Sequence, residues 1–182
     1  DSFPVEIVKI GIIENRQLLI IVIDELLQRN KDTKIIWDPV LKSSSGYSFQ
    51  QLDAFQADVN IILEKIFLVN PNFDELQWFY PECTVEESIS MLSSKTNLLL
   101  KGGHRKDNIG LDELFTTAGK HFTFPPTRND CSEKHGSGCV LSSAVAAFLA
   151  LGHPLPEACQ KAKNYTEKLL ASNKTLLGYH KL

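Results

Sequence analysis

The chain lacks the concentrated positive charge that binding to nucleic acid requires. Its 19 lysines and arginines are scattered among 22 aspartates and glutamates, and the formal net charge is −3 over 182 residues. The longest basic block is the tripeptide His104 to Lys106. Because nucleic-acid-binding surfaces need clustered cations, we expect no nucleic acid among the partners of this protein.

Long hydrophobic runs and paired cysteines are also missing. The longest apolar run near the start of the chain is Leu18 to Ile23, whereas a membrane-spanning helix needs about 20 apolar residues. The first residues show no basic region followed by an apolar one, as a secretory signal would. The four cysteines form no CxxC pair: Cys83, Cys131, Cys139 and Cys159. These absences predict a protein without a membrane partner that resides in the reducing cytoplasm.

What the chain does contain is an alternation of short apolar runs and amphipathic segments. Strands are predicted at residues 5–10, 33–37, 66–69 and 97–100. Helices are predicted at residues 15–29, with an apolar stripe from Leu18 to Leu27, and at 49–65, 73–79 and 84–92. A hairpin at 111–124 and two helices at 139–151 and 156–172 complete the chain. This order predicts a single α/β domain over residues 1–182, with a mostly parallel sheet covered by helices on both faces.

Polar residues follow the predicted strands at their carboxyl ends, where parallel sheets bind ligands. Gly11 ends the first strand, and Asp38 follows the second strand immediately before Pro39. The Asp38 carboxylate could hold Mg²⁺ through water or accept a proton, because oxygen ligands suit this cation. An Asp-Pro pair after a strand is equally typical of a plain turn, so this residue alone does not decide between the two roles.

Asn72, Glu75 and Lys101 follow the next two strands at the same predicted edge. Asn72 and Glu75 stand three apart at a helix start, where both could reach a cluster of Mg²⁺ and phosphate. Helix capping alone would also account for Asn72. Lys101 ends an apolar strand beside two glycines, a setting that suits an anion, with a solvated loop lysine as the alternative.

The stretch from Lys134 to Pro154, KHGSGCVLSSAVAAFLALGHP, joins a glycine-rich loop to a helix of small and apolar residues. Gly136, Ser137 and Gly138 would let backbone N–H groups converge, and the positive end of the helix would favour an anion there. Cys139 at the helix start would have a lowered thiol pKa and could act as a base or stabilise charge. The alternative is a tight turn before a buried helix, with Cys139 as a small core residue.

A zinc site is the remaining alternative for this region. Its possible ligands are Cys131, His135, Cys139, His153 and Cys159. Structural zinc sites usually show close ligand pairs such as CxxC, and a zinc site would leave the glycines without a purpose. We therefore favour the anion-binding interpretation.

These features point to the same chemistry. A polyphosphate, Mg²⁺ and a group that activates an attacking oxygen are the components of phosphoryl transfer, which depends on positioning and charge neutralisation. The sequence contains no GxxxxGK[ST] motif, so the site would not be that of a P-loop enzyme.

Five segments, in this order, resemble the hydroxymethylpyrimidine/phosphomethylpyrimidine kinase family of thiamine biosynthesis. They are VKIG at 8–11, DPV at 38–40, NPNFDE at 70–75, LLLKGGH at 98–104 and HGSGCVLSSAVAAFLALGHPLPEACQKAKNYT at 135–166. The last segment is long and specific, and the resemblance covers nearly the whole chain. It implies the ribokinase-like three-layer α/β/α fold, which the pyridoxal kinases share.

The resemblance also implies an activity. It is the ATP- and Mg²⁺-dependent phosphorylation of the hydroxymethyl group of 4-amino-5-hydroxymethyl-2-methylpyrimidine, followed by phosphorylation of the monophosphate. One alternative is a pyridoxine or pyridoxal kinase, which shares every motif quoted above. The other is a non-catalytic domain that binds a nucleotide or a pyrimidine phosphate. Because family members are commonly dimers, the resemblance implies a homodimer as well.

Residue roles are implied in the same way. Catalytic roles fall to the anion-hole motif and the KGGH lysine, namely Gly136, Gly138, Cys139 and Lys101. Cofactor binding falls to Ser137, Asp38, Asn72 and Glu75, with Asp38 and Glu75 near Mg²⁺, directly or through water. Substrate binding falls to Gly11, Ile12 and Cys139, although the family often has methionine where Ile12 stands.

The resemblance departs from the family pattern at the front. Family members begin with a glycine-rich strand and helix, a second strand and a small hairpin lid, and these elements hold much of the substrate pocket. This chain shows no counterpart of them, a difference of roughly 60 or more residues. We therefore expect it to be the C-terminal part of the family domain, with a reduced homologue as the alternative.

Overall fold

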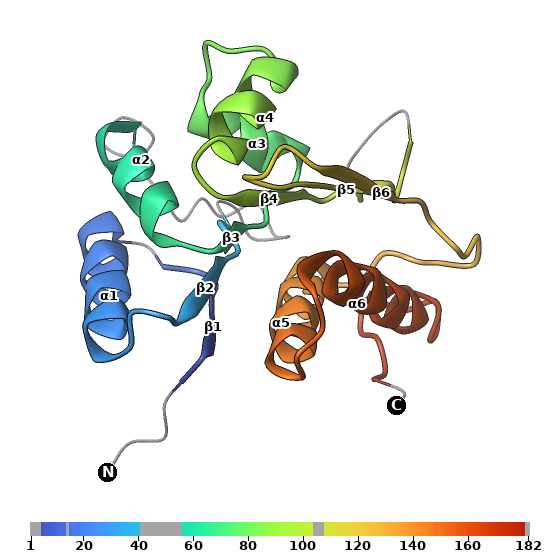
Figure 1. Ribbon diagram of the computed structural model, residues 1–182. Coiled ribbons are helices and arrows are strands. Elements are labelled where there is room, and N and C mark those ends of the chain that lie inside the picture. The colour runs from blue at the N-terminus through green and yellow to red at the C-terminus, as the bar shows by residue number, and fades with distance from the viewer. Residues whose placement is uncertain (1–4, 14, 41–55, 104–107, 181–182) are drawn as a thin grey trace.

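Six strands form one sheet in the part of the chain that this computed structural model describes, residues 5–13, 15–40, 56–103 and 108–180. The strands are β1 (Ile7–Ile10), β2 (Lys34–Trp37), β3 (Leu68–Val69), β4 (Asn97–Leu100), β5 (Asp112–Phe115) and β6 (His121–Phe124). They lie in sequence order (Figure 1), with β1 to β4 parallel and the last two strands antiparallel. The mostly parallel sheet predicted from the sequence is confirmed.

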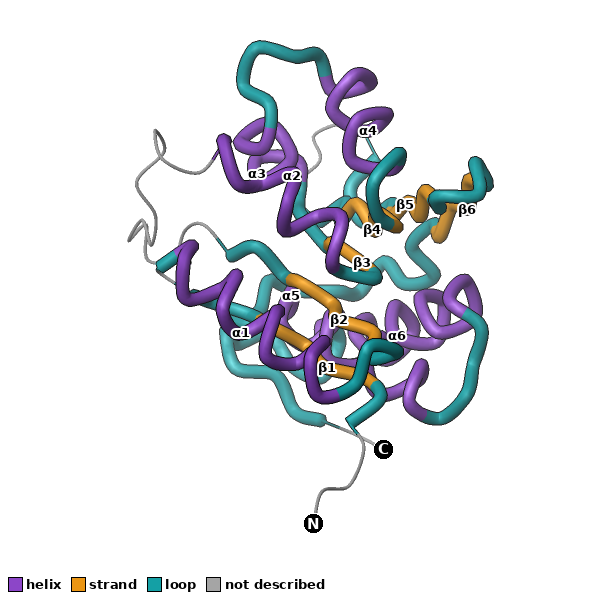
Figure 2. The backbone as a smooth tube through the Cα atoms, turned by 60° about the vertical axis from the view of Figure 1, so that its left-hand side comes forward, coloured by secondary structure: helices purple, strands orange, loops and turns teal. Residues whose placement is uncertain are grey.

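Helices cover both faces of this sheet (Figures 1 and 2). On one face lie α1 (Arg16–Arg29), α2 (Gln56–Lys65), α3 (Phe73–Phe79) and α4 (Val85–Ser93). On the other face lie α5 (Ser137–Ala150) and α6 (Leu155–Leu170). Each helical layer forms its own buried apolar cluster with the sheet, so the described elements have the predicted three-layer α/β/α arrangement.

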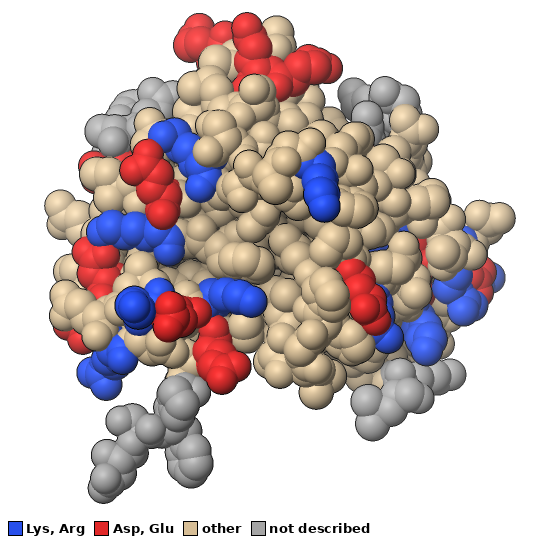
Figure 3. Space-filling model, in the orientation of Figure 1, with Lys and Arg blue, Asp and Glu red and all other residues tan. Residues whose placement is uncertain are grey.

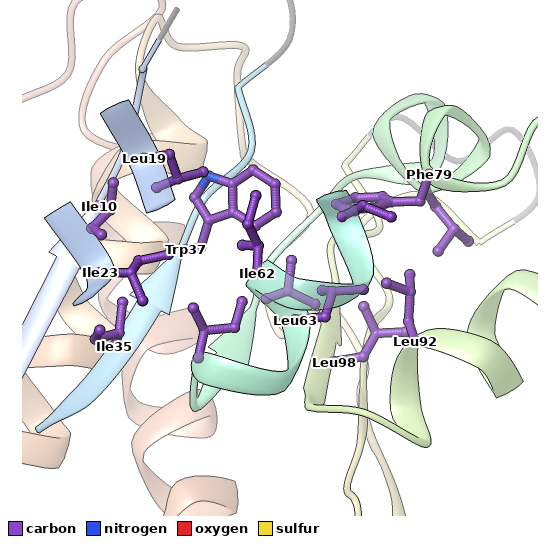
Figure 4. Packing of buried hydrophobic residues seen from close by; sticks show 14 of the residues in the cluster. Ile10, Leu19, Ile23, Ile35, Trp37, Ile62, Leu63, Phe79, Leu92 and Leu98 are labelled. Atoms are coloured by element: carbon purple, nitrogen blue, oxygen red, sulfur yellow. The ribbon is translucent and has the colours of Figure 1, made fainter. Parts of the chain in front are cut away.

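The central strands β2, β3 and β4 are largely apolar and buried, because helices cover the sheet on both faces. Successive side chains of a strand point to opposite sides. In β2, Ile35 and Trp37 therefore pack toward α1 to α4, whereas Ile36 packs toward α5 and α6. Figure 4 shows the first of these clusters, with Trp37 beside apolar side chains of α1 and α2.

Local sequence signals determine where the helices begin. Asn15 precedes α1, and its side chain accepts a hydrogen bond from the Leu18 N–H at 3.1 Å. Capping boxes at Asn72 and Thr84 begin α3 and α4. α5 begins at Ser137, two residues earlier than predicted, so the glycine-rich loop forms part of its first turn.

Other expectations are corrected or lie outside the described residues. Leu18 belongs to the predicted buried stripe of α1 yet is 49% exposed, because the helix buries Leu19 and Ile23 of the same stripe and turns Leu18 outward. The helix predicted at 49–65 is described from Gln56 onward, and residues 49–55 are not described. The basic block that begins at His104 is also outside the described part.

The surface carries charges of both signs. On the face seen in Figure 3, lysines and arginines are interspersed with aspartates and glutamates around a largely uncharged centre. Acidic side chains gather at the top, over α4, whose first turn carries Glu86 and Glu87. None of the described helices is long and apolar enough to cross a membrane.

Candidate active site

Two strand ends and two helix starts meet at the carboxyl edge of the parallel strands. Lys101 follows β4, and its Nζ lies 2.8 Å from Asp38 Oδ1 after β2 and 3.4 Å from Glu75 Oε2 in α3. A Cβ atom built on Gly138 in α5 would lie 3.4 Å from the same Nζ. The residues predicted from separate stretches of the sequence are thus brought together around one lysine.

Asp38 is the buried centre of this cluster. Its side chain is fully buried, and its backbone N–H donates to the Ile10 carbonyl at 2.9 Å. Besides Lys101, its carboxylate accepts a hydrogen bond from Ser142 Oγ at 2.9 Å and lies 3.6 Å from Lys9 Nζ. Burial alone would raise the pKa of Asp38, but the charges of Lys101 and Lys9 and the hydrogen bonds outweigh it and lower the pKa. Asp38 is therefore ionised at neutral pH.

Lys101 is held in its charged form by the two carboxylates. Its side chain is 12% exposed, and burial by itself would lower the pKa of its ammonium. The negative charges of Asp38 and Glu75 outweigh the burial, so the pKa of Lys101 is raised. The backbone holds the lysine in place through a hydrogen bond from its N–H to the Pro71 carbonyl at 2.9 Å.

Asn72 and Glu75 form the capping box of α3. The Asn72 side chain accepts from the Glu75 N–H at 2.8 Å, and the Glu75 carboxylate accepts from the Asn72 N–H at 2.7 Å. Burial raises the pKa of Glu75, while Lys101 and the Asn72 N–H oppose the rise. The capping function considered from the sequence is confirmed, and the same carboxylate also contacts Lys101, so capping and a place in the site coexist.

The glycine-rich loop opens the start of α5 toward Lys101. Gly136 has φ 76° and ψ 8°, a left-handed conformation that favours glycine. Its carbonyl accepts the Val140 N–H at 2.9 Å. Within the described residues no side chain caps this helix. The helix start therefore has no side-chain cap and lies beside Lys101 at Gly138, an arrangement that suits an anion.

Cys139 departs from the sequence-based expectation. We predicted a thiol pKa lowered by the helix start, but burial and, next to it, the charge of Asp38 raise the pKa of Cys139, with Lys9 and Lys101 opposing them. The thiol is half-buried and close to an ionised carboxylate, and both conditions disfavour a thiolate. At neutral pH Cys139 is a neutral thiol.

Gly11 and Ile12 lie at the end of β1. A Cβ atom on Gly11 would lie 2.7 Å from Lys9 Nζ, so the missing side chain leaves room for Lys9 to lean toward Asp38. The Ile12 side chain is 51% exposed at this edge. Their part in substrate binding stays a prediction.

Three residues of the site were not identified from the sequence. Lys9 interrupts an otherwise apolar strand, which was a usable signal. Ser142 stands three residues after Cys139 on the inner side of α5, where its polarity was hidden among small residues. Asn70 was considered only as the residue that ends a strand. It follows β3, which lies between β2, followed by Asp38, and β4, followed by Lys101.

The Asn70 side chain is a direct sign that the site suits a ligand. Asn70 is fully buried, and both polar atoms of its amide lack a hydrogen-bond partner among the described residues. Buried amides are normally paired. Alternation along β3, with Leu68 toward α5 and Val69 away from it, places Asn70 on the same side as Asp38 and Lys101.

The donor set fits Mg²⁺ better than zinc. Asp38, Glu75 and the Asn70 amide offer the hard oxygen atoms that Mg²⁺ prefers. Among the described residues no group of three or more His, Cys, Asp and Glu side chains is arranged to hold a metal. Of the zinc candidates, Cys159 is buried in the apolar cluster of α6, and His153 lies 3.0 Å from Glu157.

An apolar cavity of about 460 Å³ adjoins the site. One side of α5, from Cys139 to Phe148, forms one wall. Tyr165 and His180, whose Oη and Nδ1 atoms are 2.8 Å apart, form the other. Cys139 therefore borders both the charged cluster and an apolar surface.

The fold of the described residues is of the ribokinase-like class. A phosphomethylpyrimidine kinase from Clostridium difficile 630 is similar with a TM-score of 0.69 at 24% identity, over 88% of this chain and 67% of that one. The ADP complex of Bacillus subtilis pyridoxal kinase is similar with a TM-score of 0.74 at 19% identity, over 94% and 69%. These likenesses establish the fold class.

The sequence places the chain more narrowly. The family model described as phosphomethylpyrimidine kinase matches residues 1–181, so the chain belongs to that family. The hydroxymethylpyrimidine/phosphomethylpyrimidine kinase of Rhizobium meliloti (strain 1021) is 31% identical over 179 residues, 94% of this chain and 66% of the relative. The corresponding Aquifex aeolicus kinase is 30% identical over 98% of this chain and 72% of its own length. The chain thus spans about two thirds of the length of these relatives, and the resemblance inferred from the motifs is confirmed.

Proposed function

We propose that this chain acts in the ATP- and Mg²⁺-dependent phosphorylation of 4-amino-5-hydroxymethyl-2-methylpyrimidine and then of its monophosphate, in thiamine biosynthesis. The observation that carries the proposal is the buried Lys101 ammonium, held between Asp38 and Glu75 beside the uncapped start of α5. Membership of the phosphomethylpyrimidine kinase family supports the choice of acceptor.

The groups of the site divide the work of phosphoryl transfer. Lys101 and the N–H groups of the Gly136–Cys139 loop would neutralise the charge of the transferred phosphate. Asp38 and Glu75, the latter held in place by Asn72, would hold Mg²⁺, directly or through water, and the cation would supply positive charge that neutralises the phosphates of ATP. These contributions are positioning and electrostatic stabilisation, which suffice for a loose transition state.

Cys139 has a different role in this proposal from the one its position first indicated. As a neutral thiol it faces the acceptor and the anion without acting as a base. Asp38 is ionised and adjoins Cys139, so it is the group that would accept the proton of the attacking hydroxyl. A carboxylate with a lowered pKa is a weak base, which is adequate when the acceptor proton leaves late.

The cellular setting is also part of the proposal. All four cysteines are free, which supports the reducing cytoplasm. A homodimer is proposed on the family resemblance, and light scattering of the purified protein would check it.

Replacement of Lys101 tests the proposal. In the full-length polypeptide, Lys101→Ala should lower ATP- and Mg²⁺-dependent phosphorylation of the pyrimidine by about 100-fold or more, because a preorganised cation is lost. Lys95→Ala is the matched control, since Lys95 stands before the opposite end of β4 and pairs with Glu64 at 2.7 Å. Undiminished turnover in Lys101→Ala would contradict the proposal. Pyridoxal as a competing acceptor separates the two kinase activities, and nucleotide binding without turnover would indicate a non-catalytic domain.

A further inference from the structure

A second buried ionic cluster lies between α6 and the loops of the site. Lys163 in α6 is 4% exposed, and its ammonium donates to Asp112 Oδ2 at 3.1 Å and lies 3.4 Å from Glu167 Oε1. It also donates to the Gly110 carbonyl. Asp112 and Glu167 are buried as well, so two carboxylates share one ammonium. The proposed chemistry uses none of these groups.

The cluster has two arms, one through Asp112 and one through Glu167. The Asp112 arm reaches the residue next to Lys101. The other oxygen of Asp112, Oδ1, accepts the N–H of Gly102 at 2.7 Å, one residue after the lysine. The Gly102 carbonyl in turn accepts the Gly110 N–H at 2.9 Å. A Cβ atom on Gly102 would lie 1.9 Å from the Leu111 carbonyl oxygen, so this backbone is tightly enclosed. The peptide that follows Lys101 is therefore oriented by Asp112, which Lys163 holds.

The other arm reaches the segment that leads into the glycine-rich loop. Glu167 accepts hydrogen bonds from the N–H of Thr127, at 3.2 and 3.1 Å, and from its hydroxyl. Further along, Lys134 Nζ donates to the Asn173 carbonyl at 2.7 Å, and the His135 N–H donates to the Leu176 carbonyl at 2.9 Å. The segment 127–135, which leads to Gly136, is thus held by hydrogen bonds to α6 and to the residues that follow α6.

Stability alone does not explain this arrangement. Desolvation of buried charges largely offsets their attraction, and buried ion pairs can often be replaced by apolar side chains without loss of stability. The cluster instead fixes the relative orientation of the segments that it joins, because charged hydrogen bonds determine how the bonded groups are placed. Lys163 is the group that contacts both arms.

We propose that Lys163 is a positioning residue that fixes the loop after Lys101 and the segment before Gly136 relative to one another. This inference rests on the proposed function, in which Lys101 and the glycine-rich loop act on the same phosphate. Misplacement of such groups by about 1 Å can cost on the order of 100-fold in rate.

Lys163→Met in the full-length polypeptide tests the proposal. We expect kcat to fall by about 10- to 100-fold with KM for ATP changed by less than about threefold, because the loss concerns alignment in the transition state. The loss in the double variant with Lys101→Ala should be clearly less than additive, since part of the effect acts through that lysine. Full kcat in Lys163→Met, or strictly additive losses in the double variant, would overturn the proposal.

A second measurement does not depend on catalysis. Amide hydrogen exchange at Gly102 and at Thr127 should accelerate together in Lys163→Met, because both N–H groups donate to carboxylates that Lys163 holds. If the unaltered protein transfers no phosphate, the proposed function fails, and the exchange rates still decide whether Lys163 couples the two loops. Unchanged exchange at Gly102 would refute the coupling.

A milder variant covers the case in which Lys163→Met does not fold. Thr127→Val removes only the hydroxyl bond to Glu167 at an exposed position. It should accelerate exchange at residue 127 and lower kcat by a smaller factor. Thr123→Val, an exposed threonine of β6 in the same part of the chain, is the matched control and should change neither. Equal behaviour of the two threonine variants would also overturn the proposal.

Discussion

The side chains around Asp38 and Lys101 at the carboxyl edge of the sheet determine the ionisation of these two groups. Asp38 is ionised despite complete burial because Lys101, Lys9 and Ser142 surround its two oxygens. Lys101 is charged despite burial because two carboxylates face it. In the same buried position but without these neighbours, each group would tend toward its neutral form. The site therefore holds separated charges of both signs before any ligand binds.

The rate of alkylation of Cys139 measures how readily this thiol ionises. Because burial and the charge of Asp38 raise the pKa of its thiol, iodoacetamide should modify Cys139 at pH 7 at least roughly tenfold more slowly than free cysteine. In Asp38→Asn the rate should rise, since one of the two causes is removed. Mass spectrometry of the Cys139 peptide against pH provides the measurement. A titration midpoint below that of free cysteine would contradict this prediction.

Among the elements, α3 and α4 share a start signal but differ in their surroundings. Both begin with a capping box, Asn72 with Glu75 and Thr84 with Glu87. Hydrogen bonds from Thr84 lower the pKa of the solvent-exposed Glu87 carboxyl, whereas burial raises the pKa of Glu75. The same local motif thus serves a purely structural purpose in α4 and faces Lys101 in α3.

The two caps can be compared in one experiment. Asn72→Ala and Thr84→Ala should each lower the free energy of unfolding by about 1 kcal/mol, because each removes one N-cap hydrogen bond. Only Asn72→Ala should also lower phosphorylation by the full-length polypeptide. Urea denaturation and initial rates measured on the same preparations provide the check. Equal activities of the two variants would show that Asn72 is only a cap.

The start of α5 permits a similar comparison between glycines. Gly136 and Gly119, in the turn between β5 and β6, both have a positive φ, 76° and 74°, and open space where a Cβ would stand. Alanine at either position should cost about 1–2 kcal/mol of stability from backbone strain. Phosphorylation should fall further in Gly136→Ala, because the N–H groups at the helix start move with that residue. Similar rates for the two variants would argue against an anion site.

On the scale of the whole molecule, the sheet separates two apolar clusters and leaves its charged groups at the carboxyl edge. Trp37 illustrates the packing of one cluster, with its ring 5.7 Å from that of Phe79 in an edge-to-face arrangement. Lys101 pairs with Asp38 after β2 and Glu75 in α3, and Lys163 pairs with Asp112 in β5 and Glu167 in α6, so each ammonium joins a carboxylate of the sheet to one of a helix. The pH dependence of folding should therefore report on these buried groups.

Two substitutions should change that pH dependence in opposite ways. The lowered pKa of Asp38 contributes stability above about pH 4, the range of an ordinary aspartate, and this contribution is lost as pH falls through the lowered value. The raised pKa of Glu75 makes its charge a cost that disappears as pH falls toward about 4. Relative to the unaltered protein, the free energy of unfolding of Asp38→Asn should thus be lowered least at low pH. That of Glu75→Gln should be raised most at neutral pH. Urea denaturation between pH 3 and 8 tests both, and parallel curves would contradict the assignment.

Much of the fold could be predicted because its signals are local. The limits of α3 and β4 were predicted to the residue, since a capping box and an apolar strand ending at Lys101 are short-range patterns. Asp38, Glu75, Lys101 and Gly138 were expected at one edge of the sheet and do lie together, because carboxyl ends of parallel strands share one edge. Lys9, Ser142 and the state of Cys139 depend on which distant side chains come within a few ångströms, and no sequence spacing contains that information.

The amino-acid sequence by itself determined the strand and helix order, the family and the set of residues that follow the strands, because these depend on periodicity, caps and motifs within the chain. Only the tertiary structure decided the electrostatics. The contact of Lys101 with both Asp38 and Glu75 joins residues up to 63 positions apart. That packing raises the pKa of the Cys139 thiol, which was expected to be lowered, because burial and the charge of Asp38 together outweigh the charges of Lys9 and Lys101.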